Sequence, residues 1–341
     1  MVQPPPFLAA CRREPVPFTP VWLMRQAGRY MAEYRSVRAR YGFLELCKTP
    51  EAAAEVTVTA VERLGVDAAI IFADILLVLE PLGASIEFTA GDGPVIRTRI
   101  ASAADVDRLR PVAPGALEYV AESVRRARAA LEVPLIGFAG APFTLASYLI
   151  EGGSSRSFLA TKRFMHDDPG AWRALMERLV VAVRDYLNLQ IAAGADAVQL
   201  FDSWVGCLAP ADYRTFVLPH MRELIAGITR GVPVIHFGTD TAGLLDCQRA
   251  AGGDVIGLDW RVDLDAAWAR LGYDVAVQGN LDPAVLFAPL ADIRRAVARI
   301  LGQAARRPGH VFNLGHGILP DTPVANVQAL VEMVHELSAV R

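Results

Sequence analysis

The feature of this sequence that most constrains its fold is a short unit that recurs four times along the chain. In each unit a helical pattern ends at a glycine, an aspartate follows, and an apolar run then leads to another polar residue. Glycine ends a helix readily because it adopts the left-handed backbone conformation without steric cost. A strand that is apolar on both faces is typical of a parallel sheet covered by helices. The apolar runs that we interpret as such strands are residues 68–72, 197–201, 255–258 and 275–278.

Four further apolar runs alternate with helical stretches in the same way, at residues 21–24, 133–138, 232–237 and 310–314. Eight strands separated by helices in a chain of 341 residues predict a (β/α)8 or TIM barrel. Helix starts at Thr49 and Asp168, each followed by proline, support this pattern. A doubly wound sheet is the competing architecture, but no GxGxxG motif follows any of the strands.

We expect the barrel to be a single α/β domain that spans residues 1–341. Residues 1–15 begin with a proline-rich segment and are predicted to form a loose N-terminal arm. The segment 86–100 has glycines and a proline at its centre, which predicts a β-hairpin inserted after the second strand.

The composition argues against several classes of protein. Net charge is −3 at pH 7 and the lysines and arginines are scattered, so we expect no nucleic-acid-binding or membrane-binding surface. Prolines and glycines interrupt the uncharged stretch 133–150, which favours a strand, a turn and a helix over a membrane span. The N-terminus lacks the pattern of a signal peptide, and the four cysteines show no paired spacing. We therefore expect a cytoplasmic protein without disulfides or a zinc knot.

Polar side chains follow all eight predicted strands. Catalytic groups of a TIM barrel lie at the carboxyl ends of its strands, so these side chains are expected to converge on one end of the barrel. Each alone has an ordinary explanation, because aspartates often cap helices and tyrosines often pack in cores. Their convergence favours a functional site. The residues are Arg25, Arg29, Asp74, Tyr148, Asp202, Ser203, His236, Asp259, Asn280, Asp282, Asn313 and His316.

Two arginines with a glycine between them follow the first strand, as Arg25 and Arg29 on either side of Gly28. Guanidinium groups bind carboxylate and phosphate oxygens bidentately, and glycine allows close approach of a ligand to the backbone. The motif therefore indicates a ligand with several carboxylates or phosphates. A surface ion pair with Glu33 is the alternative interpretation, and the glycine-containing segment 313–317 is a second candidate phosphate site. Zinc hydrolysis and serine-nucleophile chemistry lack their HExxH and GxSxG motifs.

Five segments together resemble one known family. They read MRQAGRY at 24–30, GFAGAPFTL at 137–145, FDSW at 201–204, QGNLD at 278–282 and NLGHGI at 313–318. Through them the chain resembles the uroporphyrinogen decarboxylases, from about Pro20 to Leu330. The resemblance implies a (β/α)8 barrel, a homodimer, and an activity that needs neither cofactor nor metal. The implied reaction removes the carboxyl groups of the four acetate side chains of uroporphyrinogen III, which gives coproporphyrinogen III and CO2 in porphyrin biosynthesis.

The resemblance also implies roles for individual residues. Asp74 matches the carboxylate that accepts the pyrrole N–H groups and stabilises the cation formed when a pyrrole is protonated. Arg25 and Arg29 match arginines that hold substrate carboxylates, and Arg25 is also matched to proton delivery. We therefore expect Asp74 and Arg25 to be catalytic. The residues expected to bind the substrate are Arg25, Gln26, Ala27, Gly28, Arg29, Arg38, Asp74, Tyr148, Ser203 and His316.

Two other functions remain open from the sequence. Related barrels use zinc to transfer methyl groups from corrinoids to thiols, but Cys207 and Cys247 have no obvious set of partner ligands here. A tetrapyrrole-binding protein without activity would keep a pocket of this kind, although it would tolerate the loss of Asp74. Bound zinc would indicate the first alternative, and binding without loss of carboxyl groups would indicate the second.

Overall fold

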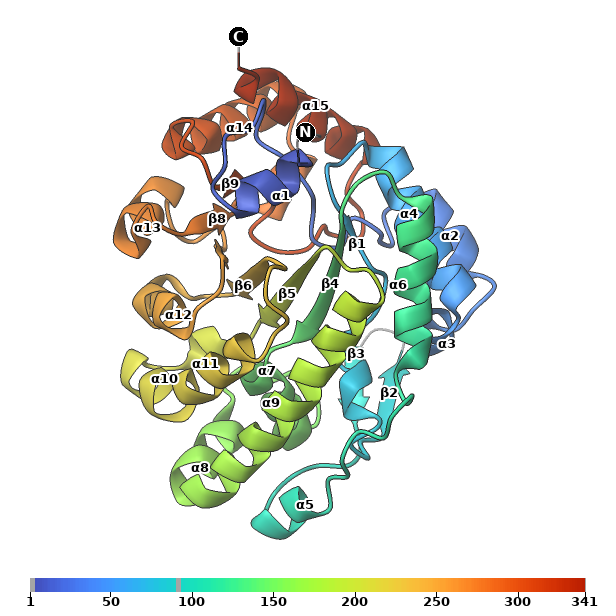
Figure 1. Ribbon diagram of the computed structural model, residues 1–341, viewed down its shortest axis with the longest axis vertical. Helices are drawn as coiled ribbons and strands as arrows, with labels where there is room; N and C mark the ends of the chain where they lie inside the picture. The colour runs from blue at the N-terminus through green and yellow to red at the C-terminus, as the bar shows by residue number, and fades with distance from the viewer. Residues whose placement is uncertain (1–3, 90–92, 341) are drawn as a thin grey trace.

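A computed structural model describes residues 4–89 and 93–340 of the chain. In this part of the molecule seven strands form one parallel sheet whose spatial order follows the order along the chain (Figure 1). Such an order is typical of a barrel, because a doubly wound sheet reverses its strand order part of the way across. The strands are β1 (Ala69–Ile70), β4 (Leu135–Gly140), β5 (Ala197–Asp202), β6 (Val234–Gly238), β7 (Val255–Gly257), β8 (Ala276–Gln278) and β9 (His310–Val311).

The eighth position of the ring is occupied by the segment that contains Val21. The backbone N–H of Trp22 donates to the carbonyl of Phe312, beyond β9, at 3.3 Å. On the other side, the N–H of Asp67 donates to the carbonyl of Val21 at 2.8 Å, just before β1. The segment therefore lies between the last and the first strand of the sheet. The predicted TIM-barrel architecture is confirmed, with the first strand reduced to an isolated bridge between Val21 and Phe312.

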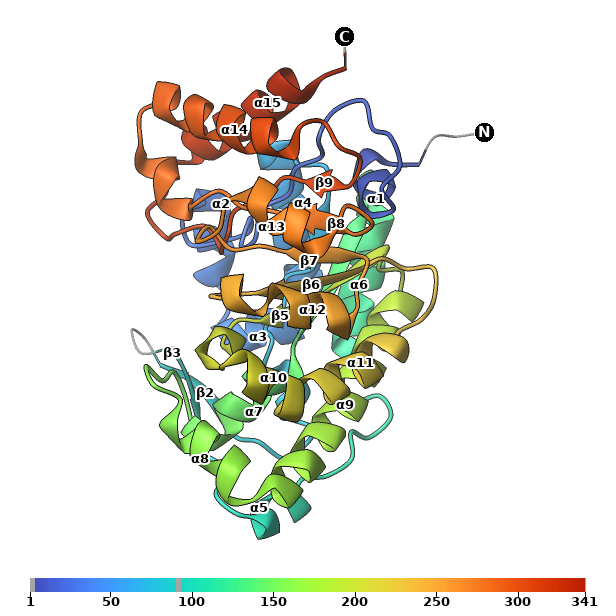
Figure 2. The same cartoon turned by 90° about the vertical axis from the view of Figure 1, so that its left-hand side faces the viewer.

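Helices cover the outside of the ring (Figures 1 and 2). Short 3-10 turns occur as η1 (Leu77–Leu79), η2 (Val205–Cys207), η3 (Ala242–Leu244) and η4 (Pro283–Phe287). The helices after the N-terminal segment are α2 (Ala32–Arg38), α3 (Phe43–Lys48), α4 (Pro50–Leu64), α5 (Ala103–Asp107), α6 (Glu118–Ala130), α7 (Pro142–Glu151), α8 (Leu159–Asp167), α9 (Pro169–Ala192), α10 (Pro210–Phe216), α11 (Leu218–Ala226), α12 (Leu245–Ala251), α13 (Leu264–Leu271), α14 (Leu290–Ala304) and α15 (Val324–Ser338).

The sequence signals for helix ends are largely reproduced. Gly65 ends α4 in the left-handed conformation, with φ at 70°. Asp168 caps α9, because its side chain accepts a hydrogen bond from the N–H of Ala171 at 2.9 Å. The cap expected from Thr49 is wrong: its hydroxyl donates to the carbonyl of Glu45 in the preceding helix instead.

The prediction of a loose arm over residues 1–15 is wrong for its central part. Residues Pro6–Cys11 form helix α1, in which Phe7 and Ala10 are fully buried. They pack with Trp22 and with the inward-facing side chains of the strands, in one hydrophobic cluster. Figure 2 shows α1 on the opposite side of the ring from β2 and β3. Helix α1 therefore covers the amino-terminal end of the barrel.

The inserted hairpin is confirmed. Strands β2 (Ile86–Thr89) and β3 (Gly93–Ile96) pair in antiparallel register, and residues 90–92 between them lie outside the described part of the chain. The N–H of Ile96 donates to the carbonyl of Gly152 at 2.9 Å, at the end of α7. The hairpin is thereby fixed to a helix that also borders the mouth of the barrel.

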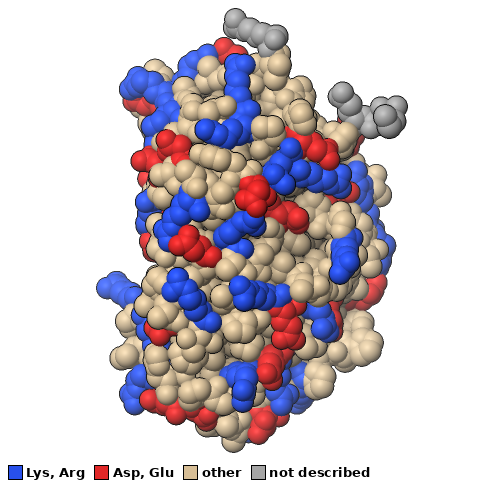
Figure 3. Space-filling view, turned by 60° about the vertical axis from the view of Figure 1, so that its left-hand side comes forward, with Lys and Arg blue, Asp and Glu red and all other residues tan. Residues whose placement is uncertain are grey.

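The surface carries both signs of charge. On the face shown in Figure 3, lysines and arginines are interspersed with aspartates and glutamates, as the scattered charges along the sequence predicted. Within residues 4–89 and 93–340, no helix is both long enough and apolar enough to cross a bilayer.

Candidate active site

A cavity of about 1010 Å³ opens at the carboxyl ends of the strands. This volume is at the upper limit of ordinary small-molecule pockets, so it suits a large ligand. The cavity brings together nine of the ten side chains or backbone positions predicted to bind substrate. These are Arg25, Ala27, Gly28, Arg29, Arg38, Asp74, Tyr148, Ser203 and His316.

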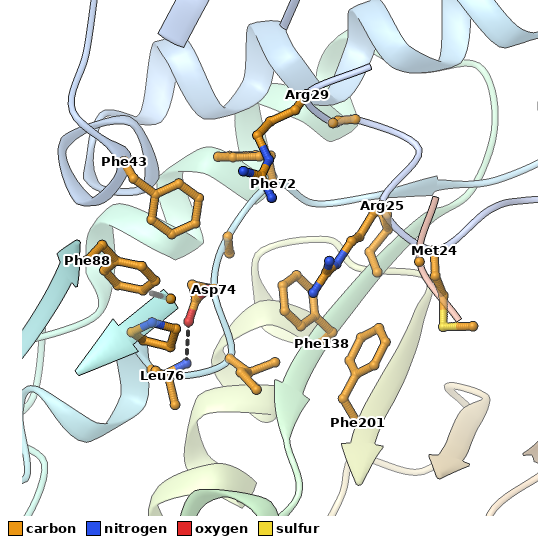
Figure 4. Close-up of a pocket in the computed structure, with 18 of the residues that line it drawn as sticks. Met24, Arg25, Arg29, Phe43, Phe72, Asp74, Leu76, Phe88, Phe138 and Phe201 are labelled. Carbon is orange, nitrogen blue, oxygen red and sulfur yellow. Dashed lines mark hydrogen bonds between the residues drawn. The ribbon is translucent and has the colours of Figure 1, made fainter. Parts of the chain in front are cut away.

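Arg25 is aimed into the cavity by its backbone. Its φ of 61° lies in the left-handed region, which is uncommon for a residue with a Cβ and turns the chain sharply. The preceding residue is held in place because the N–H of Met24 donates to Oδ1 of Asn313 at 3.1 Å. A strained conformation that is fixed by its neighbours is typical of a functional position. The guanidinium of Arg25 points into the pocket (Figure 4).

The rest of the arginine motif also faces the cavity. Arg29 extends into the space from the opposite wall to Asp74 (Figure 4). Arg38 also lines the cavity: its guanidinium donates to the carbonyl of Tyr41 and lies 5.7 Å from the centre of the Phe43 ring. The ion pair considered from the sequence is not formed, because Glu33 pairs with Arg63 at 3.2 Å. Within the described residues neither Arg25 nor Arg29 forms an ion pair with a carboxylate, so their charge is available to a ligand.

Gln26 is the one predicted binding residue whose side chain does not line the cavity. It is 1% exposed, and its Oε1 accepts the N–H of Leu23 at 3.1 Å. Its amide nitrogen donates to the carbonyl of Ala68 at 3.2 Å, next to β1. These two bonds hold the arginine turn against the sheet. The position of Gln26 therefore indicates a role in shaping the turn.

Asp74 lies at the inner end of the cavity, four residues beyond β1. One carboxylate oxygen accepts the N–H of Leu76 at 2.9 Å. Burial raises the pKa of Asp74 to about 6, although the Leu76 N–H and the charge of Arg25 oppose this shift. The group is therefore mainly ionised above pH 7. Figure 4 shows Asp74 and Arg25 reaching into the same space.

Phenylalanine rings form most of the wall around these charges, and our sequence analysis did not identify them. Phe138 and Phe201 meet edge to face, with ring centres 5.5 Å apart, and Phe43 packs against Phe88 at 4.6 Å. A signal for part of this wall exists, because a phenylalanine recurs near the end of four predicted strands. These four rings belong to Phe72, Phe138, Phe201 and Phe237, and all line the cavity. An apolar wall excludes water and strengthens the electrostatic interactions of Asp74.

Three polar side chains complete the lining from other elements. Tyr148 comes from α7, Ser203 follows β5, and His316 follows β9. Burial, with a smaller effect of the Asp74 charge, raises the pKa of Tyr148, so its hydroxyl keeps its proton. Burial, together with the charges of Arg25 and Arg261, lowers the pKa of His316 to about 4. At neutral pH both groups are uncharged and can donate hydrogen bonds to carboxylates.

Other polar residues at the strand ends do not line the cavity, and all of them except His236 have hydrogen-bond or ion-pair partners among the described residues. Asp202 accepts a hydrogen bond from Thr144, and Asp282 caps η4 through the N–H of Ala284. His236 is fully buried, and burial lowers its pKa to about 4. The other three are Asp259, which pairs with Arg261; Asn280, which bonds the carbonyls of Asp259 and Val262; and Asn313.

Across the described ranges 4–89 and 93–340, no three His, Cys, Asp or Glu side chains come together in a group that could hold a metal ion. Cys207 and Cys247, the thiols considered for the zinc-dependent alternative, are free.

Solved structures with a similar fold include a methyltransferase from Methanosarcina mazei, with a TM-score of 0.77 and 20% sequence identity over 97% of both chains. A B12-independent methionine synthase from Shewanella sp. W3-18-1 has a TM-score of 0.58 and 10% identity, over 84% of this chain and 87% of that one. At these identities the likeness shows the barrel fold alone.

The sequence comparisons go further. A model of the family described as uroporphyrinogen decarboxylase (URO-D) matches residues 3–337. The uroporphyrinogen decarboxylase of Carboxydothermus hydrogenoformans is 56% identical, over 98% of this chain and 96% of its own. That of Sorangium cellulosum is 58% identical, over 97% of this chain and 96% of its own. The chain therefore belongs to the uroporphyrinogen decarboxylase family.

Proposed function

We propose that this protein is a uroporphyrinogen decarboxylase that converts the four acetate side chains of uroporphyrinogen III to methyl groups, releasing CO2 and giving coproporphyrinogen III. Its relatives carry this name across nearly the full length of the chain. The structural observation that best supports the proposal is one carboxylate, Asp74, that lies within the electrostatic influence of Arg25 in a large cavity lined in part by aromatic rings. The product would serve porphyrin biosynthesis.

Asp74 is suited to bind the centre of the substrate. The bridges between the rings of a porphyrinogen are saturated, so its pyrrole N–H groups can all turn toward one anion. A carboxylate only accepts hydrogen bonds, and Asp74 uses one oxygen for the N–H of Leu76 while facing the cavity. The phenylalanine rings that line part of the cavity would limit competition from solvent for these donors. The ring would therefore sit over Asp74.

The same carboxylate would assist the chemistry. When a pyrrole ring is protonated it becomes a cation, and it can accept the electron pair of the C–C bond that breaks as CO2 leaves. The exocyclic carbon is then protonated and becomes a methyl group, while the ring loses its added proton. A fixed negative charge at Asp74 stabilises the cation before CO2 departs. The protonated pyrrole thus serves as the electron sink that other decarboxylases obtain from a cofactor, so we expect none here.

The arginines would bind the carboxylates of the substrate. Arg25 is the arginine whose charge acts on Asp74 and would hold the reacting acetate, whereas Arg29 and Arg38, which also line the cavity, would hold others. Guanidinium groups remain charged at all physiological pH values, so Arg25 is better suited to orient a proton donor than to supply a proton. A bound water or a substrate carboxyl group is the proton source that fits this arrangement.

Neutral side chains and backbone would complete the contacts. Tyr148, Ser203 and His316 each present a hydrogen-bond donor without a charge, which suits propionate or acetate groups that already face the arginines. The backbone at Ala27 and Gly28 also borders the cavity. Burying several carboxylates is costly without such partners, so we expect the non-reacting groups to face the open mouth.

We further propose that the protein acts as a homodimer in the cytoplasm. Membership of the family supports both points. Analytical ultracentrifugation would test the first: a single species at twice the chain mass of 36.9 kDa is expected. A species at the chain mass, across the concentrations at which the enzyme is active, would contradict it.

The activity itself is tested by anaerobic incubation of the purified protein with uroporphyrinogen III, without added metal or cofactor. Oxidation of the products to porphyrins then allows their carboxyl groups to be counted by chromatography. Passage from eight carboxyl groups to four is expected. Binding without loss of carboxyl groups would favour a protein that only binds tetrapyrroles. Absence of both, with folded protein that contains zinc, would favour the methyltransferase alternative.

A further inference from the structure

The two residues that flank Ser203, Asp202 and Trp204, both form a hydrogen bond with the hydroxyl group of Thr144 on α7. On one side, Asp202 accepts a hydrogen bond from Oγ1 of Thr144 at 2.9 Å. On the other side, the backbone N–H of Trp204 donates to the same oxygen at 3.3 Å. The hydroxyl of Thr144 therefore uses its proton for one neighbour of Ser203 and a lone pair for the other. This arrangement fixes the direction in which Ser203 enters the cavity.

The same helix supplies the neighbouring contact to the substrate. Tyr148 lies one turn after Thr144 on α7, so both side chains are on the same face of the helix. The ring of Tyr148 stacks on the ring of Trp204, with centres 3.8 Å apart and planes 28° apart. Thr144 thus bonds the backbone of the residue whose ring supports Tyr148. Ser203 and Tyr148, which come from different elements, are placed by one connected set of contacts.

Stability alone gives no good reason for a carboxylate at position 202. Asp202 and Thr144 are both fully buried. Only Oδ1 of Asp202 has a hydrogen-bond partner within the described residues, and Oδ2 has none. A buried carboxylate with a single side-chain donor is costly. Asp202 accepts the Thr144 proton at Oδ1, which orients that hydroxyl and leaves the lone pair of its oxygen directed at the N–H of Trp204, even though burial raises the pKa of Asp202 to about 7.

We infer that Asp202 and Thr144 are positioning residues of the active site, which hold Ser203 and Tyr148 at the separation needed to bind substrate carboxylates. The inference rests on the proposed function, because it assigns Ser203 and Tyr148 to the substrate. Neither Asp202 nor Thr144 lines the cavity, so both act through other residues. Their loss would loosen substrate binding and leave Asp74 and Arg25 in place.

The test compares KM and kcat among variants of Thr144. Thr144→Val keeps the shape of the side chain and removes both hydrogen bonds, whereas Thr144→Ser keeps the hydroxyl. We expect Thr144→Val to raise KM for uroporphyrinogen about tenfold while kcat changes less than about threefold, since contacts made equally in the ground and transition states affect KM. Thr144→Ser should restore KM to within about twofold of the wild type.

A matched control lies on the same helix. Ser147 is fully buried, and its hydroxyl donates only to the carbonyl of Phe143 within α7 at 2.8 Å. Ser147→Ala removes a buried hydroxyl without breaking a bond to β5, so its KM should equal that of the wild type. A purely structural defect lowers the concentration of folded enzyme, and would therefore lower the apparent kcat of any of these variants without changing KM.

A double-mutant cycle tests whether the two residues act through one hydroxyl. We expect Asp202→Ala to raise KM as Thr144→Val does, and the double variant to raise it no further. If Asp202→Ala does not fold, Asp202→Leu takes its place; it fills the side-chain volume but offers Thr144 no acceptor, so the same rise in KM is expected. An unchanged KM in Thr144→Val, measured beside an active wild type, would overturn the inference. An inactive wild type would instead overturn the proposed function.

Discussion

The side chain of Arg25 lies directly against Gly317, so closely that a Cβ at position 317 would be 2.4 Å from Cδ of Arg25 and 2.6 Å from its Cγ. Real Cβ atoms do not approach side-chain carbons to such distances, so any larger residue must displace the arginine. The glycine belongs to the segment after β9, which also carries His316. The direction of the Arg25 side chain, near the start of the sequence, therefore depends on Gly317, near its end.

Replacing Gly317 with alanine is accordingly expected to impair the enzyme. The displaced guanidinium of Arg25 would no longer be aligned with the reacting carboxylate, and we expect kcat/KM to fall about a hundredfold, as misplacement by roughly 1 Å can produce. Steady-state kinetics on uroporphyrinogen III measures this. Gly302→Ala is the matched control, because no atom lies within 4 Å of the added Cβ on α14, and it should keep full activity. Equal kcat/KM in both variants would contradict the assigned role of Gly317.

The charge of Arg25 should also be detectable at His316. Burial is the main cause that lowers the pKa of His316 to about 4, and the positive charges of Arg25 and Arg261 add to it. In the wild type the imidazole should therefore stay neutral from pH 6 to pH 8. Removing a nearby positive charge favours the imidazolium, so Arg25→Met should raise the pKa of His316. NMR titration of the ring, assigned with His316→Gln, measures both. Titration of wild-type His316 near pH 6.5 would show that the ring is not shielded from water.

The raised pKa of Asp74 predicts a cost in stability. The folded protein binds the proton of this carboxyl more tightly than the unfolded chain, since the pKa is about 6 in place of the ordinary 3.8. Stability from this group is thus present below pH 4 and is lost as the pH rises through 6. Asp74→Asn removes the buried charge, so the variant should have a higher Tm than the wild type at pH 8, by a margin that shrinks toward pH 4.

Calorimetry at several pH values measures this difference. Asp321→Asn, at an exposed position, is the control, and its Tm should follow that of the wild type. A Tm difference for Asp74→Asn that does not depend on pH would show that desolvation of the charged carboxylate does not destabilise the folded protein. A stable but inactive variant would place Asp74 among the groups that cost stability in order to serve function.

Helix α1 should contribute to stability without affecting catalysis. Phe7 is fully buried against the amino-terminal end of the barrel. Phe7→Ala should lower the free energy of unfolding by about 3–5 kcal/mol, and Phe7→Leu by less than about 1.5 kcal/mol. Denaturant unfolding measures both, and KM should be unchanged because the cavity lies at the other end. A Phe7→Ala variant as stable as the wild type would mean that residues 6–11 do not contribute to the core.

Sequence alone predicted the barrel because its signals are local. The left-handed glycine at position 65, which ends α4, and the apolar strand that follows it depend on neighbouring residues only. Helix α1 was missed although Phe7, Ala10 and Cys11 have helical spacing, because the prolines around them indicated an open chain. The helix is stabilised by packing against distant strands, which the local sequence does not reveal.

The sequence predicted which residues lie at the strand ends, but not which of them face the cavity. Residues that follow a strand alternate between the inside and the outside of the barrel, so Phe201 faces the cavity while the adjacent Asp202 does not. Which of the two faces inward depends on the tilt and register of the whole ring, which the sequence of one strand does not contain. Gln26 was predicted to bind the substrate because it lies within the arginine motif. Only the folded turn shows that its side-chain amide instead forms hydrogen bonds with the backbone.

The central claim is that the negative charge of Asp74 drives decarboxylation, and it is tested most directly by a single-turnover comparison of the wild type with Asp74→Asn. Both proteins, in excess over uroporphyrinogen III under anaerobic conditions, are sampled over time and the carboxyl groups of the products are counted. The asparagine keeps a similar shape and an oxygen acceptor but loses the charge, so binding should be largely retained while the rate falls by about a thousandfold, the scale of a lost electrostatic stabiliser. Equal rates in the two proteins would contradict the account.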